Sequence, residues 1–524
     1  MAPTLNPSAM ATGLSGHSDH PETNVLRLRP LGIDTYQEPV IYMSADCPIC
    51  RSEGWEALTR LQVALGDRVI VATLNVVTGD LLAPDEASLS DAAWRLLGAA
   101  PGDDVVVSSM PPLESLSAVR AKVYGHALSA PALTAIVRDV AAGRYAAIEL
   151  AAFVTACAGD RLDEAETIAL TRAMIDVGDR LDWPRAPVVD KHSVGGLPGN
   201  RTTMLVVPIV ASCGLLMPKT SSRAITSPAG TADAMETVAP VDLSLDAMRR
   251  VVEQEGGCIV WGGAVRLSPA DDAIIRVERP LDLDSEGQLV ASVLSKKAAA
   301  GSTHVVIDIP VGPTAKVRSA ETARRLGDRL VRVGAAVGLV VDIMPGDGTQ
   351  PIGRGIGPAL EARDVLAVLR NDAEAPADLR ARALVLAGRV LELGGRVPEG
   401  EGLALARRHL ERGGAWRKFV AICEAQGGLR EPPRAAYTRE IVATRSGRVD
   451  AIDNRRLARA AKLAGAPRSP AAGLVLHAPT GRHVSIGQPV FTLHAESPGE
   501  LAYAALYVEA NPDIVAIGAD EAQP

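Results

Sequence analysis

From residue 185 onwards the sequence repeats one order of segments: a short apolar run, a glycine-rich loop and a stretch with helical character. The apolar runs "APVVD", "LLMPK", "GCIVWGG", "THVVIDIPVG" and "VGLVVDIMPG" have the length and composition of buried strands. Strands that alternate with helices form parallel sheets, because each crossover helix lies against the sheet. This order predicts an α/β domain with a mostly parallel sheet, followed by a helical stretch at 359–425.

The remaining segments have different patterns. Before residue 112 and after residue 429, short β-like runs alternate with Gly and Pro turns. Between these regions, Leu133, Ile136 and Val140 recur at helical spacing, together with Val137. The fold class is therefore a multidomain α/β and α+β chain. We expect a flexible tail (1–24), a small β-rich N-terminal domain (25–112), a helical subdomain (113–184), the α/β domain with further helices (185–428) and a C-terminal α+β domain (429–524).

The composition excludes several classes of protein. Hydrophobic residues make up 47% and charged residues 22% of the 524 residues, as in ordinary globular proteins. The formal net charge is −8 and the basic residues are dispersed, so we expect no nucleic-acid partner and no membrane partner. Six cysteines in so long a chain indicate a reducing compartment, and the polar first two dozen residues do not resemble a signal peptide. We expect a cytoplasmic protein.

The stretch "DKHSVGGLPGNRTT" at residues 190–203 joins the first of these strands to a helix. Glycine-rich turns of this kind direct backbone N–H groups and the positive end of the helix towards one point, where an anion can bind. Lys191, Ser193, Thr202 and Thr203 add a cation and three hydroxyls. The stretch lacks the patterns of the common nucleotide-binding loops. It predicts a phosphate-sized site, although such turns also form for packing alone.

A second loop of the same kind, "KTSSRAITSPAGTAD", occupies residues 219–233. It carries five Ser and Thr hydroxyls after its first threonine, together with Arg223 and Gly230. In an open α/β sheet, ligands bind beyond the carboxyl ends of the strands, so the two loops would face one crevice. We expect one phosphate in this crevice, and a sugar hydroxyl or a second anion beside it.

Four stretches together, "DKHSVGGLPGN", "SSRAITSPAGTAD", "LSPADD" and "LVASVLSKKAAAG", resemble the thymidine and pyrimidine-nucleoside phosphorylase family. The likeness is to the branch shared by bacterial thymidine phosphorylases and archaeal AMP phosphorylases, and it extends over most of the chain. It implies a pentosyltransferase in which inorganic phosphate attacks C1′ of a nucleoside and the base leaves. With thymidine, the products would be thymine and 2-deoxyribose 1-phosphate.

The resemblance also implies roles for individual residues. It places phosphate contacts at Lys191, Ser193, Thr203, Ser221 and Thr231. It gives catalytic roles to His192 and Asp284, with Asp284 as the proton donor to the leaving base. It places nucleoside or nucleotide contacts at Gly196, Ser222, Arg223, Ala224, Ile225, Thr226, Ser227, Ser292, Lys296 and Lys316.

The chemistry of the reaction agrees with these roles. Some of these residues could nevertheless have an ordinary structural role instead. Cleavage of the N-glycosidic bond places positive charge on the sugar and negative charge on the base, so a dianion and a proton donor on opposite sides stabilise it. By its context alone, Asp284 in "RPLDLDSEG" is typical of a turn aspartate. Ser292, Lys296 and Lys297 fall on an expected helix, where lysines usually form a solvated face.

The second loop departs from the pattern of thymidine phosphorylases. These enzymes have SGRGLGHTGGT where this chain has "SSRAITSPAGT", and the additional donors favour a nucleotide 5′-phosphate. The first hypothesis is therefore thymidine phosphorolysis. The alternative is an AMP phosphorylase that gives ribose 1,5-bisphosphate and free base. A phosphoribosyltransferase on a similar scaffold would need a Mg²⁺ site, for which the sequence gives no convincing set of ligands.

The motif "CPIC", Cys47 to Cys50, has the spacing of half a zinc site or of a redox pair. No second pair and no histidine lies at ligand spacing, so we expect two structural thiols. A non-catalytic interaction protein organised by these thiols is the remaining alternative, and it leaves both anion loops unexplained. We expect no metal and no cofactor, since phosphate is a co-substrate. The expected partners are a small nucleoside or nucleotide and phosphate, and the resemblance implies a homodimer.

Overall fold

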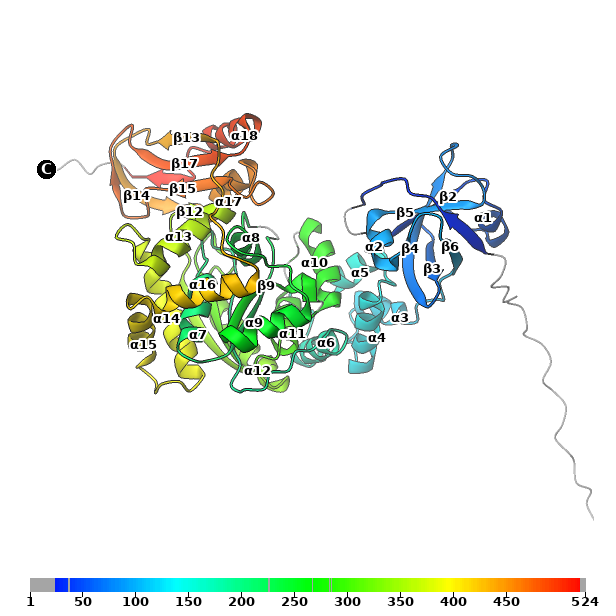
Figure 1. Ribbon diagram of the computed structural model, residues 1–524, viewed down its shortest axis with the longest axis horizontal. Coiled ribbons are helices and arrows are strands. Elements are labelled where there is room, and N and C mark those ends of the chain that lie inside the picture. Colours follow the sequence, from blue (N-terminus) through cyan, green and yellow to red (C-terminus); the bar gives the residue numbers. More distant parts are fainter. Residues whose placement is uncertain are drawn as a thin grey trace, which may run out of the picture. The chain divides into compact units, whose positions relative to one another are not determined.

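The computed structural model of the chain describes residues 24–35, 38–224, 227–265, 267–281, 283 and 285–518. Many of its elements are labelled in Figure 1. The chain separates into two compact units, and Ala142–Ile148 belongs with the N-terminal unit, which otherwise ends at Glu114.

The N-terminal unit contains a closed barrel of six strands in the order β1-β5-β2-β4-β3-β6. Alternate residues of a strand point to opposite faces, and the inward ones, such as Leu61 and Val63, are fully buried. Cys47 and Cys50 lie in this core, and Cys50 Sγ is 3.9 Å from Met43 Sδ. The elements are β1 (Val25–Leu28), β2 (Val40–Ser44), α1 (Pro48–Glu53), β3 (Arg60–Leu65), β4 (Arg68–Val77), β5 (Glu86–Leu89), α2 (Asp91–Leu97) and β6 (Asp104–Ser109).

A group of helices follows: α3 (Leu116–Val123), α4 (Ala130–Ala141), α5 (Ala147–Cys157) and α6 (Glu164–Asp176). The helical spacing at Leu133, Ile136, Val137 and Val140 is confirmed, because all four side chains are buried on one face of α4. A capping box starts α6, in which the N-cap carboxylate accepts from the backbone of Glu166 and the Glu166 side chain accepts in return. α6 packs along α11 (Glu286–Ala299) of the next region.

Five parallel strands form the centre of the α/β region. β11, β10 and β7 form one ladder and β8 and β9 another, and a parallel bridge between Val188 and Leu216 joins the two. The order across the sheet is therefore β11-β10-β7-β8-β9. The strands are β7 (Val189–Ser193), β8 (Met217–Ser221), β9 (Gly257–Trp261), β10 (His304–Val311) and β11 (Val340–Asp347).

Both faces of this sheet are covered, as expected for parallel strands. In β10, Val305 and Ile307 pack with residues of α11 and α12, whereas Val306 packs on the opposite face with α7, α13, α14 and α16. The surrounding helices are α7 (Thr203–Ser212), α8 (Thr231–Glu236), α9 (Leu245–Glu255), η1 (Gly262–Val265), α10 (Pro269–Leu281), α12 (Ala320–Ala336), α13 (Pro358–Arg370), α14 (Ala377–Leu393), α15 (Gly402–Glu411) and α16 (Gly414–Gln426).

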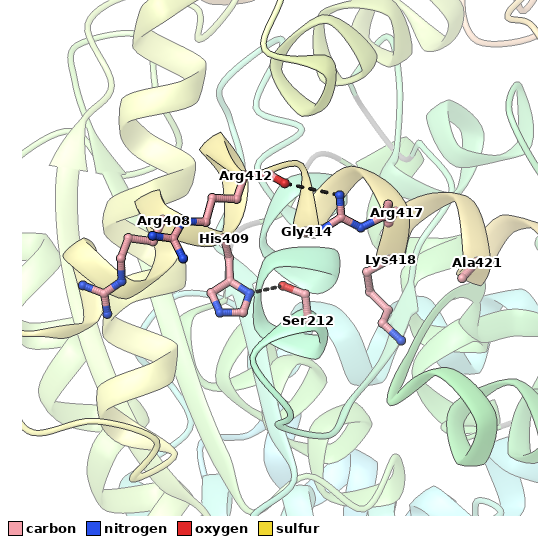
Figure 2. A pocket seen from close by; sticks show the side chains of 8 residues that line it. All are labelled: Ser212, Arg408, His409, Arg412, Gly414, Arg417, Lys418 and Ala421. Carbon is pink, nitrogen blue, oxygen red and sulfur yellow. Dashed lines mark hydrogen bonds between the residues drawn. The ribbon is translucent and has the colours of Figure 1, made fainter.

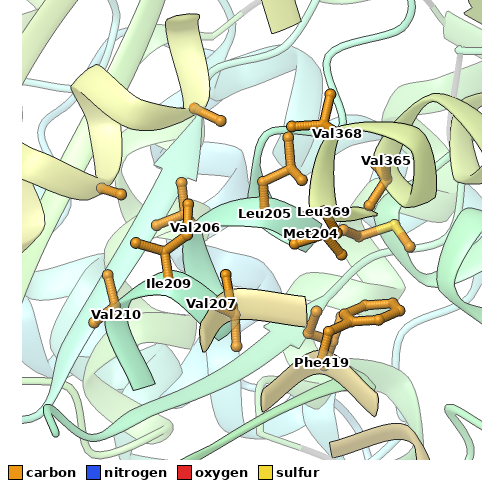
Figure 3. Packing of buried hydrophobic residues seen from close by; sticks show 14 of the residues in the cluster. Met204, Leu205, Val206, Val207, Ile209, Val210, Val365, Val368, Leu369 and Phe419 are labelled. Carbon is orange, nitrogen blue, oxygen red and sulfur yellow. The ribbon is translucent and has the colours of Figure 1, made fainter. Parts of the chain in front are cut away.

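Helix α7 is buried from Thr203 to Ala211, and its last residue, Ser212, is partly exposed. Figure 3 shows its apolar side chains against Val365 and Leu369 of α13 and Phe419 of α16. A helix that is apolar on all sides needs neighbours all round, because burying each aliphatic side chain contributes about 1.5–3 kcal/mol. This packing holds the start of α7 in a fixed place beside the sheet.

Two strands extend further than the sequence predicts. The first strand was expected to end at Asp190, but β7 continues to Ser193, which pairs with Asp308 of β10. The reason is charge compensation, because Asp308 lies within ion-pair distance of the buried Lys191. β8 likewise continues through Lys219 to Ser221. The first residues of both predicted loops are therefore strand residues.

The C-terminal region contains a four-stranded sheet in the order β12-β15-β17-β13 and a three-stranded sheet in the order β16-β14-β18. Its elements are β12 (Gly355–Ile356), β13 (Tyr437–Val442), β14 (Gly447–Ile452), α17 (Asn454–Leu463), β15 (Gly473–Leu476), β16 (His483–Val484), β17 (Pro489–Ala495), α18 (Pro498–Glu509) and β18 (Val515–Ile517). The predicted fold class is confirmed: a multidomain chain with helical, parallel α/β and α+β parts. Within the described residues, no helix combines the length and the apolar character needed to cross a membrane.

Candidate active site

Lys191 lies in a buried polar cluster near the carboxyl end of β7. Its Nζ donates to Thr202 Oγ1 at 2.8 Å and lies 3.7 Å from Asp308 Oδ2. Asp308 is also paired with Arg382 of α14. Burial lowers the pKa of Lys191 to about 8; Asp308 opposes this shift and Arg382 adds to it. The single negative charge of Asp308 thus faces the two positive charges of Lys191 and Arg382. The net positive charge that remains can attract an anion.

Asn200 connects the first loop to β7, which carries Lys191, and to the neighbouring strand β10. Its Nδ2 lies 3.2 Å from Ser193 Oγ and 3.3 Å from Asp308 Oδ2, and its Oδ1 accepts from Thr202 Oγ1 at 2.9 Å. Thr203 follows directly as the first residue of α7. The structure therefore brings Lys191, Ser193 and Thr203 to one end of the sheet, as a phosphate site there requires.

The glycines of the first loop are needed for close packing. Gly196 has φ +82°, and a Cβ atom there would overlap the backbone nitrogen of Lys316. Gly199 has φ +74°, and a Cβ there would overlap the carbonyl oxygen of Ile352. Both backbone conformations favour glycine, and both positions lack room for a side chain. The predicted contact residue Lys316 is thus beside the loop through its backbone, while its side chain is exposed.

Arg201 joins the first loop to the second. Its Nη1 donates to Thr231 Oγ1 at 2.9 Å and its Nη2 to the carbonyl oxygen of Ala229 at 3.0 Å. Its Nε pairs with the buried carboxylate of Glu361 on α13. Thr231 is the first residue of α8, so this arginine holds the two helix starts beside each other.

The Ser221 hydroxyl is a candidate hydrogen-bond donor for a ligand. Its hydroxyl is buried and has no hydrogen-bond partner among the described residues. Leaving a buried hydroxyl unpaired costs about 1–3 kcal/mol, so such atoms in native proteins commonly meet a ligand or water. The expected phosphate contact at Ser221 fits this observation.

The rest of the second loop is braced by acidic side chains of α8. Asp233 Oδ2 accepts from the backbone nitrogens of Ala224 and Gly230 at 2.6 and 2.8 Å. Arg223 pairs with Glu236, with Nη2 and Oε1 2.9 Å apart, and its guanidinium lies 4.9 Å from the ring centroid of Trp261. Arg223 is therefore engaged within the protein. In the same loop, Ser227 Oγ donates to the carbonyl oxygen of Ala229 at 2.9 Å, and Ser222 is exposed.

Asp190 organises a second charged cluster next to the first. Its Oδ1 lies 3.3 Å from Lys219 Nζ and its Oδ2 lies 2.7 Å from Lys297 Nζ, with all three side chains buried. Burial alone would raise the pKa of Asp190, but the two ammonium groups outweigh it and lower this pKa. Lys297 is 3% exposed, so the alternative of a solvated lysine face does not hold for it.

His192 follows Lys191 on β7, and its surroundings favour the neutral imidazole. Burial, together with the positive charges of Lys297, Lys219, Lys191 and Lys296, holds its pKa well below 6.5. A neutral imidazole can donate one hydrogen bond and accept another. This state suits a residue that contacts a nucleobase edge.

Lys296 and Ser292 lie one turn apart on α11. Lys296 Nζ is 3.4 Å from Ser292 Oγ and 2.5 Å from Asp271 Oδ2 of α10. Burial disfavours the Lys296 ammonium, but Asp271 and Asp272 outweigh burial and raise its pKa. The "LSPADD" motif therefore keeps Lys296 charged and in place.

Ile225, Thr226 and Asp284 lie outside the described residues, so their assignments stay predictions. The sequence reasoning assigned no role to Asn200 or Arg201, although both stand in the quoted first loop. It also missed Asp308, whose signal is a lone carboxylate inside the apolar run "HVVIDIPV".

No group of three or more His, Cys, Asp or Glu side chains suited to a metal ion occurs in the part of the chain that the structure describes. All six cysteines are free, buried thiols. Burial raises the pKa of Cys50 to about 12, and its neighbour Cys47 adds to the shift. Both members of the "CPIC" pair are thus packed inside the N-terminal barrel.

Three known domain families match the chain. Residues 116–178 match the helical bundle domain of the glycosyl transferase family, and residues 185–416 match its a/b domain. Residues 448–514 match the pyrimidine nucleoside phosphorylase C-terminal domain. All the described candidate residues fall within the a/b domain.

Relatives match the chain over nearly its full length. A protein of Polaromonas sp. (strain JS666) named "Putative thymidine phosphorylase" is 68% identical over 490 residues, which cover 94% of this chain and 96% of that protein. Proteins of the same name from Hahella chejuensis and Legionella pneumophila (strain Philadelphia 1) are 59% and 60% identical, covering 95% and 94% of this chain and 98% and 95% of their own lengths.

One solved structure has the same fold over part of the chain. The anthranilate phosphoribosyltransferase of Thermus thermophilus is 21% identical, with a TM-score of 0.50, and the match covers 59% of this chain and 99% of that one. The bacterial relatives are much more similar in sequence and match nearly the whole chain, whereas this structure shares only the fold of a part of it. This chain belongs to the thymidine and pyrimidine-nucleoside phosphorylase family of pentosyltransferases.

Proposed function

We propose that this chain catalyses the phosphate-dependent cleavage of thymidine to thymine and 2-deoxyribose 1-phosphate. The proposal is supported by the buried cation of Lys191, which contacts Thr202 at the start of α7, and by Arg201 of the same loop, which holds Thr231 at the start of α8. Membership of the phosphorylase family indicates that the anion bound at this proposed site is the phosphate of a phosphorolysis reaction.

In the reaction, an oxygen of inorganic phosphate forms a bond to C1′ while the bond from C1′ to the base nitrogen breaks. The electron pair of that bond moves to the base, which then takes up a proton. Lys191, with Ser193, Thr203, Ser221 and Thr231, would hold the phosphate. Holding it in line with the breaking bond replaces a bimolecular encounter by a fixed geometry.

On the other side of the sugar, the residues would act on the base. The charged ammonium of Lys296 and the hydroxyl of Ser292 would stabilise negative charge as it develops on a base oxygen. His192, as a neutral imidazole, would donate to the same base. Asp284 would supply the proton. The remaining nucleoside contacts would come from Gly196, Lys316 and the loop of Ser222 to Ser227.

Phosphorolysis of AMP is a second candidate, favoured by the hydroxyl-rich sequence of the second loop. One feature weighs against it: Arg223, the arginine of that loop, is already paired with Glu236 and Asp233. A nucleotide 5′-phosphate would have to displace one of these carboxylates. We therefore propose thymidine as the first substrate.

The wider proposal is a cytoplasmic homodimer that acts without metal or cofactor and binds no nucleic acid. The excess of acidic over basic residues supports the last point, since the net charge is −8.

Base release from thymidine, uridine, AMP and CMP, measured side by side with and without inorganic phosphate, tests the substrate. Phosphate-dependent release of thymine, faster than release from AMP or CMP, is the expected result. Release from AMP or CMP alone would assign the second loop to a 5′-phosphate and overturn the choice of substrate. Release that does not depend on phosphate would overturn phosphorolysis itself.

A further inference from the structure

A cavity of about 490 Å³ lies where α15 ends and α16 begins, beside the last residue of α7. Figure 2 shows five basic side chains around it: Arg408, His409, Arg412, Arg417 and Lys418. Ser212 of α7 forms part of its wall. None of the described residues that line it is acidic.

The positive charge of this cavity is only partly compensated. Lys418 Nζ pairs with Glu255 at 2.9 Å, and Arg417 Nη1 donates to the carbonyl oxygen of Arg412 at 3.3 Å. The guanidinium groups of Arg408 and Arg412 have no hydrogen-bond or ion-pair partner among the described residues. Like charges one helical turn apart, as in this pair, destabilise a helix. The cluster therefore has a free-energy cost unless an anion offsets it.

Interaction with helix dipoles accounts for the basic side chains at the end of α15 but not for those at the start of α16. Arg408 and Arg412 lie at the carboxyl end of α15, where a cation is favourable. Arg417 and Lys418 lie near the start of α16, where the dipole disfavours a cation. An anion in the cavity would pair with these side chains and with the positive start of α16 together.

The histidine holds the wall of the cavity in place. Ser212 Oγ donates its one proton to the carbonyl oxygen of Ile209 at 2.7 Å, so it accepts from His409 Nδ1 at 3.0 Å. This bond, drawn in Figure 2, connects α15 to the end of α7. The cavity is thus framed by three packed helices and has a defined shape.

We propose that this cavity is a second anion site, which binds a small phosphorylated metabolite of about the size of a nucleoside phosphate. Its volume is in the usual range for small-molecule sites, and guanidinium groups match phosphate oxygens in geometry as well as in charge. A nucleic acid or an anionic membrane is disfavoured by the net charge of −8.

This site is distinct from the proposed reaction site. Thr203 at the start of α7 belongs to the phosphate loops, and Ser212 at its end lines the cavity. Ten helical residues span about 15 Å, so the two anion sites lie at opposite ends of one buried helix.

Calorimetric titration of the full chain with ADP, and with adenosine for comparison, tests the proposal. Arg412→Ala should weaken ADP binding at least tenfold, and adenosine should not bind at the site. Arg407→Ala is the matched control, because Arg407 is exposed on the same helix and does not line the cavity. It should leave the dissociation constant unchanged within twofold. Lys191→Ala should also retain this binding, which separates it from the phosphate loops.

Three results would overturn the proposal: equal ADP affinity in Arg412→Ala and wild type, an equal loss in Arg407→Ala, or loss of the binding in Lys191→Ala. Arg412 is exposed, so its replacement should leave the melting temperature unchanged. Arg408→Ala gives a second variant of the same kind, with the same expected loss.

Discussion

The Lys191 ammonium lies 3.7 Å from the Asp308 carboxylate, and neither side chain is more than 1% exposed. Asp308 accepts from Arg382 and Asn200 as well, so Lys191 is not neutralised by a partner of its own. A buried cation of this kind is ready to bind an anion, because the protein has already met the free-energy cost of burying it.

Replacing Lys191 by methionine should therefore lower kcat/KM for phosphate by about 10²–10³ or more, the usual effect of removing a positioned charged donor. Methionine keeps most of the side-chain volume, and Arg382 still compensates Asp308. The melting temperature and the initial rate at saturating thymidine measure the two effects. A folded variant with near wild-type kcat/KM would contradict the assigned role.

The lowered pKa of Lys191 predicts a basic limb in the pH profile. The cationic form binds phosphate, and it is present below a pKa of about 8 and lost as the pH rises through that value. The value of kcat/KM for phosphate, which reports the free enzyme, should fall towards tenfold per pH unit above that point. A profile that stays flat from pH 7 to pH 10 would contradict this account.

Gly196 and its neighbour Gly195 offer a matched pair of substitutions. Both have positive φ, +82° and +94°, so alanine strains the backbone at either position. A Cβ at Gly196 would also overlap the Lys316 backbone, whereas a Cβ at Gly195 meets nothing within 4 Å. Gly196→Ala should therefore raise KM for the nucleoside well beyond Gly195→Ala. Equal effects would mean that backbone strain alone matters.

Arg201 is expected to act through the position of the second loop. Arg201→Met removes the ion-pair partner of the buried Glu361 carboxylate, which should lower the free energy of unfolding by about 3–5 kcal/mol. The double variant Arg201→Met with Glu361→Gln removes that charge, so stability should recover in part. KM should remain raised in both variants, because Thr231 and Ala229 have still lost their donor. Recovery of KM together with stability would make Arg201 purely structural.

Features of the site that depend on local sequence could be predicted, whereas features that depend on contacts between distant residues could not. The alternation of apolar runs and glycine loops gave the parallel sheet, and the loop composition gave an anion site at Lys191. The pairing of Lys191 with Asp308 depends on the register between β7 and β10, which are more than a hundred residues apart. Nothing local to either strand encodes that register.

The same limit applies to Lys297. Its place on a helix was predictable, but its burial depends on which face of α11 meets the sheet and on Asp190 being there to receive it. The predicted end of β7 at Asp190 is wrong for a related reason. Polar residues usually end a strand, but here Asp308 of the neighbouring strand pairs with the residues that follow. Local patterns gave the elements, and non-local charge pairs determined the details of the site.

In the proposed reaction, phosphate is the nucleophile and Lys191 holds it. Following ³¹P NMR of the wild-type chain with thymidine and inorganic phosphate tests this most directly. The phosphate signal should be replaced by that of 2-deoxyribose 1-phosphate, in equal amount to the thymine released, and Lys191→Met should show neither change. Thymine release without a new phosphate ester, or equal ester formation by Lys191→Met, would contradict the account.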